Sequence, residues 1–531
     1  MAHAPIRFDQ TPGHDTLTIE ITDGLKMVVP NDIRQITPYV LLEQEDWFED
    51  EIHFIRKLAQ PGMAMVDIGA NFGIYSLAMA QAIRQIAAAD TPEDHGKFWA
   101  IEPASTTADH LRLSVKANDF KNIAVLQMAL SDSEGDGYLT IQGSSELNAL
   151  ADGPGDDTEQ VQLSTIDTLM ADNFGDTAID FMKIDAEGAE ADILRGGAKF
   201  FADQSPLVMF ELSHGDGLNT DLVQQFSAMG YNSYRLIPGL DILVPFDVNA
   251  KPCGFLLNLF ACKEDCAHRL MDRGLMLHPT HDMAPVTPAS WDDFLALQPW
   301  VAASNGQTGW VHWAQGDLRA GEQMLRDALC HWAAAHKPAA EADKRSPHED
   351  ASHRYAQLTA ALRRIESHPA VHDQNAPGRI PYVLTAARIL GDMGERKKRL
   401  EHLQITVAGL AGSQIQLPAP FLAPSSRFDW LINNFNMGAW LGASLREASN
   451  DLRSYSSCYT SFESTLEILG PLLKSPYPRP ENARRYLLSI LGNAIPVEGD
   501  LPSQFSILAT RQDSHRNADL WQPHLPESMR A

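Results

Sequence analysis

Three side chains that can accept a proton follow apolar runs in the middle of the chain. Asp185 and Glu187 come after residues 179–184, and His214 follows residues 207–210. The sequence predicts both runs as buried strands, and the carboxyl ends of such strands face the ligand crevice of a doubly wound sheet. A base at that edge could take the proton of a bound hydroxyl, which typically contributes about 10²–10⁴-fold to the rate. Alignment of two bound reactants can supply effective molarities of about 10⁵–10⁸ M, so we expect positioning to dominate.

These residues also have purely structural interpretations. Glu187 or Glu190 could cap the helix predicted from Gly188, because acids favour the positive end of a helix dipole. Lys183 could pair with one of the acids or contact substrate, and a loop histidine such as His214 is more often solvated than catalytic. Two carboxylates and a histidine could also chelate a divalent cation. No diagnostic ligand spacing is present, so we assign no metal.

The elements that must position these groups begin with a strand, a glycine turn and a helix. Residues 63–68 form an apolar run interrupted only by Asp67, and Gly69 and Gly73 punctuate the turn that follows. Apolar residues then recur at helical spacing through 74–82. Gly69 permits the tight bend, and Gly73 lets helix and strand pack closely. This arrangement is typical of a nucleotide-binding corner.

Three details favour S-adenosylmethionine over NAD as the ligand of this corner. Asn71 stands where the dinucleotide pattern has a glycine for close approach to a pyrophosphate. Glu102 ends the next predicted strand and could accept hydrogen bonds from both ribose hydroxyls, and it lies farther on than the roughly 20 residues of the dinucleotide pattern. Finally, a carboxylate such as Asp67 near the turn suits a cationic sulfonium better than an anionic pyrophosphate.

Five motifs, in this order, resemble those of the FkbM-type methyltransferases. They are VDIGANFG at 66–73, IEP at 101–103, ALSDSEG at 129–135, TIDTL at 165–169 and KIDAEGAE at 183–190. The similarity spans most of residues 15–265, about half of the chain. It implies an S-adenosylmethionine-dependent O-methyltransferase that acts on a hydroxyl of a sugar, a glycan or a secondary metabolite. Spacing and periodicity alone indicate only a nucleotide-type ligand in an α/β domain.

The resemblance also implies a Rossmann-like class I methyltransferase fold. Residues 232–237 and 256–261 are predicted to close a seven-stranded sheet, with the last strand antiparallel. In such a fold Ala129 and Leu130, after a third strand predicted over 125–130, line the adenine. The polar loop 142–160 is a candidate lid or acceptor loop. The predicted cofactor-binding residues are Asp67, Gly69, Asn71, Gly73, Glu102, Ala129, Leu130 and Asp185, and those predicted to face the acceptor are Asp185, Glu187 and His214.

The chain divides into four predicted parts. They are a hairpin and covering helix over 1–60, the methyltransferase domain over 61–270, a linker over 271–290 and a mostly α-helical domain over 291–531. Helical spacing places the covering helix over 47–58. Within the helical domain, residues 313–329 weakly resemble a tetratricopeptide hairpin and 386–395 echo them. Residues 428–452 are predicted as another amphipathic helix, which carries Trp430 and Trp440. An irregular bundle is an open alternative. Such an extension fits recognition of a protein partner or a large acceptor better than it fits chemistry.

Composition excludes several other classes of function. The formal net charge is −27 and no basic stripe is visible, so we expect no nucleic-acid partner. The five cysteines form no disulfide framework, and Cys262, Cys266 and His268 give only a faint zinc pattern. We expect no membrane span and no secretory signal, and hence a cytoplasmic protein.

Two other functions remain open at this point. One is a catalytically inactive nucleotide-binding protein whose helical half does most of its work. The other is an NAD-linked oxidoreductase, which Asn71 and the displaced acid Glu102 disfavour.

Overall fold

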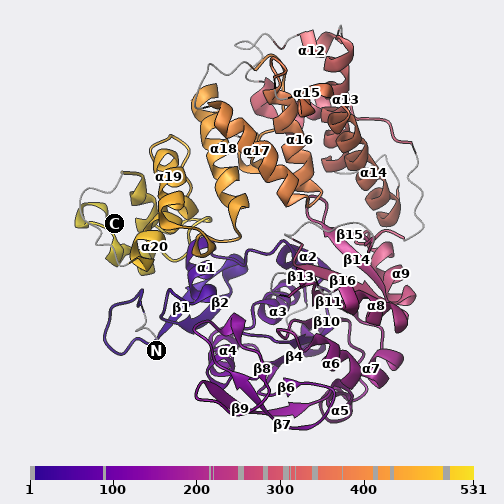
Figure 1. Ribbon diagram of the computed structural model, residues 1–531, viewed down its shortest axis with the longest axis vertical. Coiled ribbons are helices and arrows are strands. Elements are labelled where there is room, and N and C mark those ends of the chain that lie inside the picture. The colour runs from indigo at the N-terminus through magenta and orange to yellow at the C-terminus, as the bar shows by residue number, and fades with distance from the viewer. Residues whose placement is uncertain are drawn as a thin grey trace.

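The computed structural model places the central sheet and its helices in one part of the molecule and an array of helices beside it (Figure 1). It describes residues 6–87, 91–214, 217–218, 220–248, 256–278, 285–302, 310, 312–316, 318–337, 345–373, 375–410, 417–430, 436–493 and 503–530. In Figure 1 the array of helices ends next to the N-terminal hairpin, so the two ends of the chain lie on the same side of the molecule.

The N-terminal segment folds as a hairpin followed by two helices. β1 (Thr16–Glu20) pairs antiparallel with β2 (Lys26–Pro30), which confirms the predicted hairpin. α1 (Ile36–Gln44) and α2 (Glu51–Leu58) follow. The helix predicted over 47–58 therefore begins only at Glu51.

The central sheet has the strand order β15-β14-β16-β11-β10-β3-β4-β5. Its strands are β3 (Ala64–Ile68), β4 (Lys97–Ile101), β5 (Ile123–Leu126), β10 (Phe181–Ile184), β11 (Leu207–Glu211), β14 (Asn232–Ile237), β15 (Ile242–Pro245) and β16 (Asn258–Cys262). The five strands from β5 to β11 are parallel, and β16 runs antiparallel to its neighbours β11 and β14. The predicted α/β fold with an antiparallel closing strand is confirmed.

The expected number of seven strands is wrong by one. β15 lies in the segment between the two closing strands, which we expected to be only turns. Its run Ile242–Val244 is apolar and pairs antiparallel with β14 to form the edge of the sheet. The run is too short to stand out from its turn-rich surroundings in the sequence.

Side chains of the parallel strands alternate between two hydrophobic cores, as the period of two requires. Met65, Phe181 and Met209 belong to a core that continues into the N-terminal segment and the helical array. Val66 and Met182 belong to a second core on the other face. The helical array is thus packed on one face of the sheet through shared apolar contacts.

The helices of the α/β part and a small second sheet complete this region. The helices are α3 (Ile74–Ile86), α4 (Ser105–Ala117), α5 (Ile166–Leu169), α6 (Glu190–Gly196), α7 (Ala198–Asp203), α8 (Thr220–Ala228) and α9 (Glu264–Asp272). β6 (Ala129–Leu130), β7 (Gly135–Thr140), β8 (Leu150–Ala151) and β9 (Thr158–Ser164) form the second sheet in the order β6-β9-β7-β8, and β12 (Ser213–His214) pairs with β13 (Gly217–Leu218). The prediction of one strand over 125–130 is wrong, because the chain leaves the central sheet after Leu126 and Ala129 pairs with β9 instead.

The helical array follows the α/β part along the chain. Its helices are α10 (Trp291–Leu297), α12 (His312–Gln315), α13 (Ala320–His336), α14 (Pro347–Glu366), α15 (Pro369–His372), α16 (Ile380–Asp392), α17 (Arg396–Leu410), α18 (Met437–Arg453), α19 (Phe462–Leu473), α20 (Pro480–Gly492) and α21 (Ala518–Trp521). The two tetratricopeptide-like segments do not share one arrangement. Residues 313–329 pair a four-residue helix with α13, whereas 386–395 join the long helices α16 and α17.

A buried polar cluster joins the N-terminal segment to the end of the helical array. The carboxylate of Glu43, at the end of α1, is fully buried and accepts hydrogen bonds from Ser456, Ser457 and Arg485. Glu45 accepts two hydrogen bonds from Asn517. The C-terminal helices thereby fix the position of α1.

Among the helices of the described ranges, none combines the length and the apolar character needed to cross a membrane.

Candidate active site

The glycine turn after β3 is held close to the loop after β10. Gly69 has a φ of 73°, and a Cβ built on it would lie 1.7 Å from the backbone carbonyl oxygen of Asp185. Gly73 has a φ of 85° and is the N-cap of α3. A Cβ at Gly73 would lie 2.2 Å from a side-chain carbon of Leu111. Both positions therefore require glycine, one for the approach of the neighbouring loop and one for helix packing.

Glu102 fixes the geometry between this turn and the end of β4. One of its carboxylate oxygens accepts a hydrogen bond from the backbone N–H of Asn71 at 2.9 Å, and the other accepts from Ala104 at 2.9 Å. The side chain is 7% exposed, and burial raises its pKa to about 7. Because a carboxylate has about four lone-pair sites, both oxygens can still accept hydrogen bonds from a ligand.

Asp67 lies beneath the turn and is not part of the cavity wall. Its Oδ2 accepts hydrogen bonds from the backbone N–H and the hydroxyl of Ser76, at 3.2 and 2.7 Å. These bonds tie β3 to α3. Asp67 is buried and is absent from the residues that line the cavity, and its role toward a cationic ligand stays a prediction.

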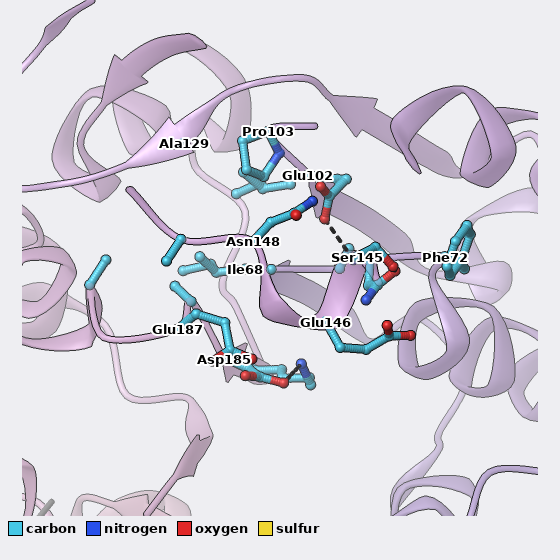
Figure 2. Close-up of a pocket in the computed structure, with 18 of the residues that line it drawn as sticks. Ile68, Phe72, Glu102, Pro103, Ala129, Ser145, Glu146, Asn148, Asp185 and Glu187 are labelled. Carbon is cyan, nitrogen blue, oxygen red and sulfur yellow. Dashed lines mark hydrogen bonds and ion pairs between the residues drawn. The ribbon is translucent and has the colours of Figure 1, made fainter. Parts of the chain in front are cut away.

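A cavity of about 130 Å³ opens above the glycine turn. Figure 2 shows Glu102 and Pro103 at one end of this cavity, Asp185 and Glu187 at the other, and Ser145 with Glu146 along its side. We call it the turn cavity. The predicted site residues that line it are Gly69, Asn71, Glu102, Ala129, Leu130, Asp185 and Glu187. Gly73 lies behind the wall, and the side chain of His214 falls outside the described part of the structure.

Three carboxylates meet at the strand-end side of the turn cavity. One oxygen each of Asp185, Glu187 and Glu211 lies within 4.8 Å of the other two. Burial and then the charge of Asp185 raise the pKa of Glu187 to about 7. Burial, Asp185 and Glu187 raise that of Glu211 to about 9. Both shifts favour the protonated form of a carboxyl group in this cluster.

Lys183 pairs with one member of this carboxylate cluster. Its Nζ donates a hydrogen bond to Asp185 at 2.8 Å. Burial opposes the charge of Lys183, but Asp185 and Asp67 outweigh it and hold the pKa of Lys183 above its usual range. The pairing interpretation of this lysine matches the geometry.

Glu190 is the first residue of α6, and the capping role considered for it is not seen, because the N-cap is Ala189 and no side chain caps this helix. Its Oε1 accepts hydrogen bonds from the backbone N–H groups of Ala186 and Gly188, at 3.0 and 3.1 Å. The loop before α6 is thereby closed on itself. Glu187 lies at the tip of this loop with a φ of 48°, and its side chain lines the turn cavity.

Comparison with known families gives a match over this same region. Residues 67–233 match the family model described as the methyltransferase FkbM domain. This segment resembles the FkbM methyltransferase domain. The similarity inferred from the five motifs is thereby confirmed, and it supports methyl transfer. No curated protein sequence matches the chain.

Solved structures show similarity to this chain at low sequence identity and low TM-score. A methyltransferase FkbM from Methylobacillus flagellatus KT is 19% identical, with 38% of this chain and 43% of that chain covered and a TM-score of 0.25. Trm5b from Pyrococcus abyssi is 10% identical, with 47% and 55% covered and a TM-score of 0.26. An S-adenosylmethionine-dependent O-methyltransferase from Thermotoga maritima is 11% identical, with 48% and 95% covered and a TM-score of 0.24. The chain thus spans about half of the length of the first two.

Several residues of this site were not assigned from the sequence. Glu211 is the last residue of β11, just as Asp185 directly follows β10. An acid at the end of a predicted strand is visible in the sequence, so Glu211 could have been found in the same way as Asp185. Glu49 had no such signal, because it reaches the turn cavity only through tertiary packing of the N-terminal segment. It accepts a hydrogen bond from the hydroxyl of Tyr75 at 2.5 Å. The candidate loop 142–160 contributes Ser145, whose hydroxyl donates to the side-chain oxygen of Asn71 at 2.9 Å.

Proposed function

We propose that this protein is an S-adenosylmethionine-dependent O-methyltransferase of the FkbM type, which transfers a methyl group to a hydroxyl of a sugar, glycan or secondary metabolite. The observation that carries the proposal is the turn cavity, which has the carboxylate of Glu102 at one end and the carboxylate cluster at the other (Figure 2). The match to the FkbM domain over residues 67–233 supports the choice of cofactor.

The residues of the turn cavity fit the chemistry of this cofactor. Glu102 has free acceptor capacity suited to ribose hydroxyls. Gly69 and Asn71 leave open space at the turn, and Ala129 and Leu130 provide an apolar wall. When bound, S-adenosylmethionine supplies an electrophilic methyl group on a sulfonium.

The carboxylate cluster is proposed to bind and deprotonate the acceptor hydroxyl. Glu187 is our candidate base, because its pKa of about 7 keeps part of it ionised at neutral pH. It would take the hydroxyl proton while the hydroxyl oxygen gains the methyl group. Asp185 is tied to Lys183 and is proposed to orient the hydroxyl, and His214 stays a predicted alternative base.

Residues 61–270 are proposed to carry out the chemistry, and residues 291–531 to recognise an acceptor or a protein partner. Residues 1–60 would cover the site, and residues 271–290 would link the two parts. Contacts between Glu43 and Arg485 support a shared role for the covering segment and the helices. A cytoplasmic location stays a prediction.

Isothermal titration with S-adenosylhomocysteine tests the cofactor assignment. We expect the wild-type protein to bind it, and Glu102→Ala to bind at least tenfold more weakly because the acceptor for the ribose is lost. Glu134→Ala is the matched control and should bind as the wild type does, because Glu134 is exposed and lies just before β7. Preference for NAD would favour the oxidoreductase, and binding without turnover on any hydroxyl acceptor would favour the inactive binding protein.

A further inference from the structure

A second cavity lies where the α/β part meets the helical array. It has a volume of about 470 Å³, and we call it the junction cavity. Its walls come from the segment before α2, from β14, from the turn between α16 and α17, and from α18 and α20. Glu49 lines both this cavity and the turn cavity, so the two cavities approach each other at this residue.

Two arginines of the junction cavity carry charge that no acid neutralises directly. Arg235 donates to the backbone carbonyl of Met393 at 3.0 Å, and Arg399 donates to that of Pro424 at 2.7 Å. Within the described ranges, neither guanidinium has a carboxylate oxygen within 4.0 Å. The Nε of Arg399 is buried without a hydrogen-bond partner. Burial and then the neighbouring Arg388 lower the pKa of Arg399 to about 10, while Asp392 and Asp451 act in the opposite direction.

The acids of the junction cavity do not cancel this charge. Asp451 and Glu481 form ion pairs with Arg479 and Arg485, at 2.8 to 2.9 Å. Glu51 is buried, and burial followed by the charge of Glu49 raises its pKa well above the usual range, which favours its neutral form. Glu49 and Asp50 are the remaining acids of the wall. Burial raises the pKa of both, although the charges of Arg396 and Arg399 act against this rise at Asp50.

Aromatic side chains form another part of the wall. The rings of Phe48 and Tyr455 lie 5.1 Å apart, and both residues line the junction cavity. The guanidinium of Arg396 lies over the ring of Tyr455, at 4.2 Å from its centre. Much of the remaining wall is charged, so the junction cavity combines a small ring surface with many charged groups and suits a polar ligand. The guanidinium group in particular suits carboxylate and phosphate, since its planar donors match their oxygens.

We propose that the junction cavity binds the methyl acceptor, and that this acceptor is a ring alcohol bearing a phosphate or carboxylate group. The anionic group lies against Arg235 and Arg399, the ring lies against Phe48 and Tyr455, and the hydroxyl to be methylated points past Glu49 to the turn cavity. This inference rests on the proposed function, and it gives that function its class of acceptor.

Calorimetric titration of the full chain, saturated with S-adenosylhomocysteine, tests the proposal. The probes are glucose 1-phosphate, glucuronate, inorganic phosphate and glucose. We expect glucose 1-phosphate or glucuronate to bind at least tenfold more tightly than glucose, and the better of the two identifies the anionic group. Arg399→Gln should weaken that binding at least tenfold. Arg235→Gln should do the same, and because Arg235 lies on a different element, this second variant tests the proposal if Arg399→Gln does not fold.

Arg363→Gln, at an exposed position of α14, is the matched control and should bind as the wild type does. Equal binding of charged and neutral sugars, binding of no anionic probe, or unchanged binding in both cavity variants would overturn the proposal. Inorganic phosphate binding as tightly as glucose 1-phosphate would overturn it too, because the ring would then contribute nothing.

The same titrations separate this inference from the proposed function. S-adenosylhomocysteine binding reports on the turn cavity, and we expect it to stay within twofold of the wild type in both arginine variants. If S-adenosylhomocysteine binds and the sugar anions do not, only the acceptor inference fails. If S-adenosylhomocysteine itself does not bind the wild type, the methyl-transfer function fails and the acceptor inference with it.

Discussion

The turn cavity takes most of its wall from residues that lie between 68 and 189, within the α/β part. The junction cavity instead combines residues from 44–53, 235–238, 256–257, 391–399, 425–427, 448–455 and 479–485. The first depends on local geometry, since a glycine turn, a strand end and a capped loop place its groups. The second depends on how two parts of the chain pack together. A change in one should therefore leave the other largely intact, and this independence can be tested from both sides.

Gly69→Ala should have the largest effect and should act on the turn cavity alone. The new Cβ meets the carbonyl oxygen of Asp185 at 1.7 Å, and a φ of 73° is strained for alanine. We expect S-adenosylhomocysteine binding to fall by more than 100-fold in calorimetry and the midpoint of thermal unfolding to fall.

Gly143→Ala is the control, because nothing lies within 4 Å of a Cβ built there. Sugar-anion binding at the junction cavity should persist in Gly69→Ala. If both cavities lose their ligands together while the protein stays folded, the cavities are not independent.

Glu43→Gln should instead weaken binding at the junction cavity and leave binding at the turn cavity intact. Glu43 is buried and its partners include Arg485, which lines the junction cavity. Removing one charge from a buried ion pair costs about 3 kcal/mol, since it leaves the partner uncompensated. We expect the free energy of unfolding in urea to fall by about this amount and sugar-anion binding to weaken.

The exposed Glu134→Gln should change neither quantity. S-adenosylhomocysteine binding should survive in Glu43→Gln at temperatures where the variant is folded. A loss of that binding with sugar-anion binding retained would reverse the assignment of Glu43 to the junction.

This contrast also explains what the sequence could predict. Gly69, Asn71 and Glu102 were found because glycine in a turn and an acid at a strand end are local signals. Arg235 and Arg399 belong to no motif, and only the packing of β14 against the turn between α16 and α17 brings them to one cavity.

The same limit applies to the errors in the fold. β15 was missed because four residues between turns give no clear period, and its pairing with β14 is a tertiary contact. The predicted helix over 428–452 begins at Met437, and Trp430, expected on it, lies in a separate turn with 63% of its surface exposed. Amphipathic spacing predicted that a helix exists here but not where it begins.

A pH titration of stability gives the smallest of the expected effects and reports on Glu102. Burial raises its pKa from 4.5 to about 7. Between these values the native protein keeps a proton that the unfolded chain releases, so the free energy of unfolding falls as the pH rises through this window. A shift of this size corresponds to at most about 3 kcal/mol.

Glu102→Gln cannot titrate, so its stability should fall less steeply between pH 4.5 and 7 when both proteins are unfolded with urea. Glu187 is expected to keep part of the slope in the variant, because its pKa is also raised to about 7. The double variant Glu102→Gln, Glu187→Gln should therefore be flatter still. Since both carboxylates line the turn cavity, S-adenosylhomocysteine should reduce the slope of the wild type by binding beside Glu102 and favouring its ionised form. An unchanged slope in the double variant would show that other acids dominate the pH dependence and that the turn cavity is not the protonated site inferred from its burial.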